Sequence, residues 1–264
     1  MSAVVHIGVI TRRNLLANLR LPDVLVLSTV QPVTFMLMFL YVFGGAIEPS
    51  LPPAAQGEYV NWLIPGIITQ SAVFGSVPTA FGLNNDRANG VIDRFRSLPM
   101  ARSAVLAGRT TADLLRNAFI LVLQLGVGIA LGFRWQTSIL GMLAALGVAL
   151  AFGYACSWVM AAIGLAIRNA EAIQAAVYMV VFPLTLTSSV FLPTNTMPDW
   201  LAAFAEHQPI TIVSNTLRGL TLGEQALPAG HTITGELFMT AAWTLGILVL
   251  FAPLAVRTYR RSVS

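Results

Sequence analysis

Six long apolar runs divide the chain, and each has close to the 20 or so residues that a helix needs to cross the hydrocarbon core of a bilayer. The runs are 24–45, 59–83, 114–133, 140–167, 172–192 and 237–256. The fourth belongs to an uncharged stretch of 33 residues, 135–167, which is too short for two spans and a turn, so we expect an interfacial lead-in before residue 140. The pattern predicts an all-α integral membrane protein with six transmembrane helices and a transmembrane domain at 24–256.

The first run has a second possible interpretation, as a signal sequence. The apolar part of a signal sequence has about 7–15 residues and follows a short basic segment. This run is longer, begins only at residue 24, and contains Gln31 and Pro32. We therefore interpret it as a true span.

The segments outside the domain, 1–23 and 257–264, differ in character. Apolar residues recur in the first at helical spacing beside arginines, at Val5, Val9, Leu16 and Leu19. This pattern is typical of an amphipathic helix in the inner membrane interface, with a solvated tail as the alternative. The second segment is predicted to be a basic cytoplasmic tail.

The loop 84–113, between the second and third runs, contains a short apolar stripe. Ile92, Phe95 and Leu98 follow one another at three-residue spacing, and Pro99 ends the helical stretch. A helix this short does not persist alone in water, so the stripe must pack against something. It could pack on the ends of its own bundle or in the groove of a partner protein, and the residues alone favour neither.

The segment 193–236, between the fifth and sixth runs, carries two helix starts, at Pro198 and Pro209. The second helix is expected to end near Gly223. Both stretches are too apolar for an exposed loop and too short to span. We therefore predict two re-entrant or interfacial helices.

Composition supports the membrane assignment. Only 10% of the residues are charged and 56% are hydrophobic, with a mean hydropathy of +0.75, whereas a soluble domain has about 25% charged residues. The net charge of +4 comes from arginines in loops beside the apolar runs. Membrane lipid is therefore the expected anionic partner, and nucleic acid is not.

The same arginines predict the orientation, because basic residues near helix ends remain cytoplasmic. With the N-terminus inside, 13 of the 15 Arg residues lie on the inner side, and only Arg134 and Arg218 lie outside. Both termini are therefore predicted to be cytoplasmic.

The polar residues within the runs restrict the chemistry. The middle of every predicted span lacks Asp, Glu, Lys, Arg and His, which argues against a proton-coupled carrier, although backbone carbonyls could still bind sodium. The chain has no Lys, so it has no Walker A loop, and its three His residues are too far apart for a recognisable metal site. We expect no enzyme activity, cofactor or metal in this chain, and an uphill transport step would take its energy from another polypeptide. The conspicuous polar side chains in the spans are either interhelical hydrogen-bonding groups or pathway residues: Gln31, Gln70, Gln124 and Gln174.

With these features the sequence resembles the ABC-2 type transporter permeases, in particular the branch of daunorubicin-resistance and nodulation-type exporter subunits. One region of resemblance is an acidic–basic pair followed by a Gly, a basic residue and a Pro, at Asp86, Arg87, Gly90, Arg94, Leu98 and Pro99. The other is a Pro–x–Trp, x–Pro and Arg–Gly arrangement, at Pro198, Trp200, Pro209, Arg218 and Gly219. Members often have Glu where this chain has Asp86.

The resemblance implies a mechanism. Two permease subunits, identical or paralogous, would form the pathway in a bacterial plasma membrane, and two cytoplasmic ATPase subunits would bind ATP and Mg. The first set of residues, with Ile92 and Phe95, would couple to the ATPase, and the second set would form an outer gate. The cargo would be a hydrophobic or amphiphilic drug, lipid or glycolipid. A facilitative or sodium-driven carrier and a non-transporting scaffold are the alternatives.

Overall fold

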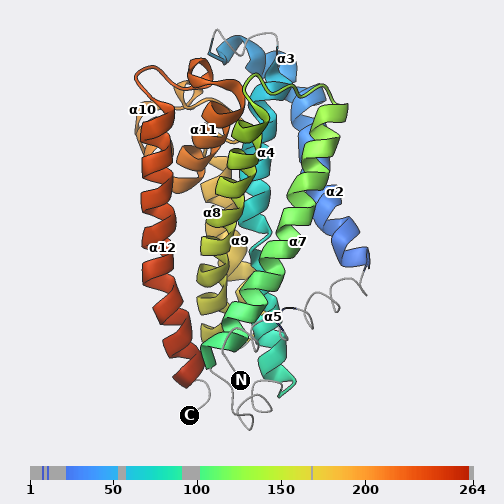
Figure 1. Ribbon diagram of the computed structural model, residues 1–264, viewed down its shortest axis with the longest axis vertical. Coiled ribbons are helices and arrows are strands. Elements are labelled where there is room, and N and C mark those ends of the chain that lie inside the picture. The colour runs from blue at the N-terminus through green and yellow to red at the C-terminus, as the bar shows by residue number, and fades with distance from the viewer. Residues whose placement is uncertain are drawn as a thin grey trace.

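The computed structural model describes residues 22–52, 58–90, 102–167 and 169–261, together with residues 8 and 11. These residues form helices and connecting turns, with no strand among them. The longer helices run side by side in one bundle (Figure 1). In chain order the helices are α2 (Pro22–Met38), a π-helix (Phe39–Phe43), α3 (Gly44–Ile47), α4 (Tyr59–Phe74), α5 (Val77–Ala88), α7 (Arg102–Ala130), α8 (Ile139–Ala166), α9 (Ala170–Leu186), α10 (Asp199–His207), α11 (Pro209–Leu222) and α12 (Ile233–Arg261).

Five stretches in the described part of the chain are long and apolar enough to cross a membrane. They are Thr29–Ser50, Tyr59–Ala88, Leu106–Ala130, Ile139–Ala166 and Ile233–Tyr259. The remaining predicted span corresponds to α9, an apolar helix of 17 residues that ends at Leu186, not at residue 192. Its length is about 26 Å at 1.5 Å per residue, slightly less than the hydrocarbon core. The chain after α9 is tied to α11 instead, because the Ser189 amide donates to Thr211 Oγ1 at 3.0 Å.

The second predicted span is broken in its middle. α4 ends at Phe74, and α5 begins at Val77. Pro78 explains the break, because it has no amide proton to donate to the carbonyl of Phe74 and its ring crowds that carbonyl. The helix then continues to Ala88, five residues beyond the predicted end.

α8 forms the centre of the bundle and contacts most of the other helices: α4, α5, α7, α9, α11 and α12. The lead-in before α8 packs on the end of α11. The backbone N–H of Gln136 donates to Thr221 O at 2.8 Å, and the Thr137 hydroxyl donates to Leu220 O at 2.6 Å. These bonds satisfy carbonyls that the last turn of a helix leaves without partners.

The two short helices predicted in the segment 193–236 are α10 and α11. Pro198 immediately precedes α10, Pro209 is the first residue of α11, and Gly223, with φ +95°, follows α11. Nearly all of α11 is buried within the protein. Both helices lie at the same end of the bundle as α3, and α5 ends at the opposite end (Figure 1).

Two predicted features lie mainly outside the described residues. One is the amphipathic segment 1–23, of which Thr11 is described: it is buried, and its hydroxyl donates to Gly108 O at 3.0 Å. The other is the stripe of Ile92, Phe95 and Leu98. Arg94 and Pro99 of the coupling residues lie outside as well.

Candidate functional site

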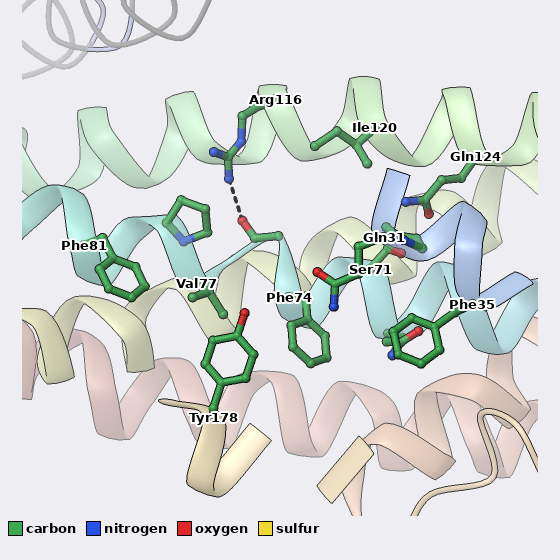
Figure 2. Close-up of a pocket in the computed structure, with 14 residues that line it drawn as sticks. Gln31, Phe35, Ser71, Phe74, Val77, Phe81, Arg116, Ile120, Gln124 and Tyr178 are labelled. Atoms are coloured by element: carbon green, nitrogen blue, oxygen red, sulfur yellow. Dashed lines mark hydrogen bonds between the residues drawn. The ribbon is translucent and has the colours of Figure 1, made fainter. Parts of the chain in front are cut away.

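A cavity of about 380 Å³ lies beside the α4–α5 break, between α2, α4, α5, α7 and α9 (Figure 2). We call it the break cavity. Gln31, Gln70 and Gln124, which come from three different helices, all line it. Gln174, which is exposed on α9, does not line it. The structure thus brings three of the four predicted pathway residues together.

Several side chains that line the break cavity contain buried polar atoms without a hydrogen-bond partner in the described structure. These atoms are Gln70 Oε1, Ser71 Oγ, Arg116 Nε and both amide atoms of Gln124. A buried polar group without a partner costs about 1–3 kcal/mol. These atoms are themselves enclosed by protein, so a polar ligand group or water would reach them only after a movement of the side chains that line the break cavity.

The rest of the wall is apolar and partly aromatic. Phe35 of α2, Phe74 of α4 and Phe81 of α5 line the break cavity, and Tyr178 of α9 points into it from the side opposite Arg116 (Figure 2). The rings of Phe74 and Tyr178 lie 6.3 Å apart between centroids. An apolar wall with a few convergent polar groups is typical of sites for small organic ligands, and the volume is within their usual range of about 300–1,000 Å³.

Three side chains of α7 hydrogen-bond across the helix break. Arg116 Nη2 donates to Gly75 O at 2.9 Å, and Asn117 Nδ2 donates to Ala72 O at 3.3 Å. On the other side of the break, Thr79 Oγ1 donates to Asp113 Oδ2 at 2.6 Å. These bonds supply partners for carbonyls at the end of α4, so α7 holds the broken helix in this conformation.

The position of these residues corrects one prediction. Ionisable groups were expected to be absent from the middle of every span, and this is wrong for the third. α7 begins at Arg102, not at residue 114, so Asp113 and Arg116 lie well inside the candidate span Leu106–Ala130. Arg116 is about 15 Å from its start at 1.5 Å per residue, and both side chains are only 5% exposed.

At the end of the bundle that holds α10 and α11, Arg218 is buried with 1% exposure. Its Nε donates to Trp62 O at 3.1 Å, its Nη2 donates to Ser189 O at 2.6 Å, and its Nη1 donates to Ser189 Oγ and Asn215 Oδ1. The guanidinium also lies 3.6 Å from the centroid of the Trp62 ring. Burial lowers the pKa of Arg218, which lies outside the candidate spans, to about 9, so the group is still charged at neutral pH.

A family model described as "ABC-2 type transporter" matches residues 5–222. This chain belongs to that family. It is 34% identical over 248 residues to the daunorubicin resistance ABC transporter permease protein of Streptomyces coeruleorubidus, an alignment that covers 94% of this chain and 83% of the relative. Two proteins of Mycobacterium tuberculosis are also similar. One is a probable doxorubicin resistance ABC transporter permease protein, 28% identical over 236 residues, with 89% of this chain and 81% of the relative covered. The other is a doxorubicin resistance ABC transporter permease protein, 26% identical over 231 residues, with 86% and 80% covered.

Family membership and the several long apolar helices together describe a multi-pass membrane protein. Within this ABC-2 protein, two of the predicted coupling residues hold α5 against its neighbours. Asp86 accepts a 2.5 Å ion-paired hydrogen bond from Arg109 of α7, and Arg87 Nη1 donates to Leu165 O of α8 at 3.1 Å. Gly90, with φ +66°, follows the end of α5 in a backbone conformation that favours glycine.

The five residues predicted for the outer gate of the ABC-2 protein do not form a single cluster. Arg218 and Gly219 are buried in α11, whereas Trp200 on α10 is 74% exposed. A Cβ atom on Gly219 would lie 2.9 Å from the side chain of Ile233, so the chain is closely packed there. Arg218 is thus an internal contact between α11, α4 and the segment after α9.

Sequence reasoning missed Arg116 as a cavity residue because it placed Arg116 at the edge of the third span. A signal was available in the pattern. Thr110, Asp113, Asn117 and Gln124 recur at spacings of three, four and seven residues, which places them along one side of a helix. A polar stripe that continues into an apolar run indicates a helix that begins earlier than its apolar part.

Proposed function

We propose that this ABC-2 protein is the membrane-spanning permease subunit of an ATP-binding cassette exporter, and that the break cavity is part of the passage of its cargo. The observation that carries the proposal is the set of buried, unpartnered polar atoms around a cavity between five helices. Polar groups inside a membrane protein are costly and commonly mark substrate pathways. The mixed polar and aromatic lining suits a hydrophobic or amphiphilic molecule, and the relatives are named for resistance to daunorubicin and doxorubicin, which are molecules of that kind.

The energy source in this proposal is a separate cytoplasmic ATPase, present in two copies, that binds ATP and Mg. The absence of Lys supports it, because a Walker A loop needs that residue. A second permease subunit, identical or paralogous, would complete the pathway in the bacterial plasma membrane. We further propose that α9 is a sixth span, tilted little because it is short, and that both termini are cytoplasmic, as the arginine distribution indicates.

In this proposal α5 transmits the motion of the ATPase to the break cavity. The coupling residues lie in and just after α5, and Val77, Pro78 and Phe81 at the opposite end of α5 line the break cavity. Asp86 and Arg87 join α5 to α7 and α8, so a force on the segment after α5 would move the helix as a unit with its contacts. Movement of α5 at the break would change the shape of the break cavity.

One observation favours a second candidate function, an ion-coupled carrier. Asp113 and Arg116 are buried within a candidate span, and ionisable groups at such depth also occur in proton relays. The two functions differ in their energy source. Vesicles that contain the chain with its ATPase, loaded with daunorubicin or a fluorescent phospholipid, should export only with hydrolysable ATP. Export driven by an ion gradient without ATP, and abolished by an ionophore, would establish the carrier instead.

The coupling role of the stripe predicts a specific loss. Phe95→Ala should abolish ATP-driven export and weaken the binding of the ATPase by about thirtyfold, because truncation of a buried aromatic anchor commonly costs about 2 kcal/mol or more. Arg96→Ala should have a mild effect, since an exposed ion pair contributes about 0–1 kcal/mol. Co-purification of the ATPase with each variant, together with export, measures both effects. If Phe95→Ala keeps its ATPase and exports normally, the stripe packs on its own bundle.

A further inference from the structure

A second cavity, of about 310 Å³, lies between α10, α11 and the first turns of α12. We call it the α10–α12 pocket. It is at the end of the bundle that holds α10 and α11, opposite the end of α5 (Figure 1). The α10–α12 pocket and the break cavity share no lining residue, so a ligand bound in one would be distinct from a ligand bound in the other.

The charged side chains that line the α10–α12 pocket are carboxylates. Glu206 of α10 and Glu236 of α12 both line it, and no arginine does. The other titratable side chains in its wall are His207 and His231. Glu206 and both histidines are exposed, so the pocket is open to solvent at these residues. With neutral histidines the pocket presents two negative charges.

Glu236 is the buried member of this set, with 5% of the residue exposed. Its Oε1 accepts a 2.5 Å hydrogen bond from Nδ1 of His231, which is the one side-chain hydrogen bond of Glu236 among the described residues. A neutral imidazole can donate this bond, so Glu236 can remain charged without a protonated partner. A carboxylate has about four acceptor positions on its two oxygens. Glu236 therefore retains capacity for a further donor.

Arg218 of α11 balances part of this charge. It acts electrostatically on Glu236, but the two side chains form no ion pair in the described structure, and Arg218 does not line the α10–α12 pocket. Its guanidinium donates to neutral groups instead, in α4, in the segment after α9 and in α11. Two carboxylates against one arginine leave an excess of negative charge around the pocket.

The pocket also has an apolar side and a fixed frame. Ile212 of α11 and Met239 of α12 line it opposite the charged groups of the loop and α10 in sequence. One turn after Glu236, the hydroxyls of Thr240 and Thr216 lie 2.7 Å apart and join α12 to α11 through a buried hydrogen bond. The walls that carry Ile212 and Glu236 are thus held together before a ligand binds.

We propose that the α10–α12 pocket binds amphiphilic primary amines in their protonated form, with Glu236 and Glu206 as counterions. An ammonium group has three N–H donors and no acceptor, so it can form charge-assisted hydrogen bonds to both carboxylates. The apolar body of the amine would lie against Ile212 and Met239. The inference does not rest on the proposed function, because it concerns a site separate from the break cavity.

The test measures photolabelling of the purified chain, without ATPase or ATP, in phosphatidylcholine nanodiscs at pH 7.5. Two probes carry the same aryl diazirine and differ only in the head, which is an aminomethyl group, protonated at this pH, or a neutral hydroxymethyl group of similar size. Mass spectrometry of the labelled peptides locates each probe. We expect the amine to label segments 206–212 and 230–239 with an apparent affinity at least about tenfold higher than that of the alcohol. Equal labelling by the two probes, or no labelling of these segments by the amine, would overturn the proposal.

Variants assign the preference to the two carboxylates. Glu236→Gln keeps the size of the side chain and removes its charge, so it should lower the apparent affinity for the amine by about tenfold. Glu206→Gln should lower it by about threefold, because Glu206 is exposed and solvent screens its charge. The matched control is Asp199→Asn, which removes an exposed carboxylate from the same helix as Glu206 but outside the pocket, and should change labelling by less than about twofold.

The variants also set the limits of the assignment. An amine preference that survives unchanged in folded Glu236→Gln and Glu206→Gln proteins would contradict it. If Glu236→Gln does not fold, Glu206→Gln on the surface of the pocket and the comparison of the two probes on the unchanged chain still decide the matter.

A free amine and the head group of phosphatidylethanolamine share this chemistry, and a change of lipid separates the two sources. Replacement of part of the phosphatidylcholine by phosphatidylethanolamine should suppress labelling by the amine probe if the lipid occupies the pocket. Unchanged labelling supports a free amphiphilic amine as the ligand. Failure of ATP-driven export with the probe ranking intact would count against the proposed function and not against this inference.

Discussion

Replacement of Arg218 by Leu is expected to destabilise the protein by about 3 kcal/mol or more. The substitution leaves Ser189 O and Asn215 Oδ1 without their charged donor in a fully buried position, and each such loss costs about 1–3 kcal/mol. For a chain of this size, that corresponds to a fall of about 6–12 °C in the midpoint of thermal unfolding. Cys156 provides the readout, because it is the single cysteine and is buried, so a thiol-reactive fluorophore reports its exposure on heating.

Two matched variants give this result its meaning. Arg218→Lys keeps the charge but cannot make the forked contacts. Its midpoint of thermal unfolding should therefore lie between those of Arg218→Leu and the unchanged protein. Arg257→Leu removes an exposed arginine near the end of α12 and should shift the midpoint by about 2 °C or less. If Arg218→Leu also shifts the midpoint by only about 2 °C or less, the contacts around Arg218 do not hold α11 in place.

Gly164→Ala is also expected to destabilise the protein, because α5 and α8 touch there through their backbones. A Cβ atom on Gly164 would lie 2.7 Å from the Cα atom of Ala80 and closer still to its carbonyl oxygen. Backbone atoms cannot rotate away as the end of a side chain can, so the two helices would have to separate. Overpacking of this kind typically costs about 1–3 kcal/mol.

Gly147→Ala is the matched control within the same helix. A Cβ atom on Gly147 would meet nothing within 4 Å, so the change brings only the better helix propensity of alanine, about 0.5–1 kcal/mol. The thiol assay should therefore show Gly147→Ala equal to or more stable than the unchanged protein, and Gly164→Ala less stable. Equal midpoints for the two variants would show that α5 and α8 do not approach as closely as described.

The helices could be predicted from sequence wherever apolar length alone decides them. Every apolar run is helical in the structure, although the second is broken and the fifth is short, and Pro198, Pro209 and Gly223 correctly marked the limits of α10 and α11. These predictions depend on local physics, namely the hydrophobic length of a span and the backbone limits of proline and glycine.

Predictions that depend on packing were less complete. The α4–α5 break was not expected, although Pro78 was visible, because the run around it carries no charge and was interpreted as one continuous span. Arg116 and Arg218 were expected near loops, but contacts with other helices bury both. Gln174 resembled the other three glutamines in sequence, but it is exposed on α9, one helical turn before Tyr178, and does not line the break cavity.

The most direct test of the account is ATP-driven export by a double variant, Gln70→Leu with Gln124→Leu, compared with Gln174→Leu. Leucine removes the polar atoms from the break cavity without placing an unpaired polar group there, so the bundle should still fold. In vesicles that contain the ATPase, with daunorubicin and fluorescent phosphatidylglycerol as probes, the double variant should export at less than about a tenth of the normal rate while it retains the ATPase. Gln174→Leu should export normally. Normal export by the double variant, or an equal loss in Gln174→Leu, would contradict the assignment of the break cavity to the cargo pathway.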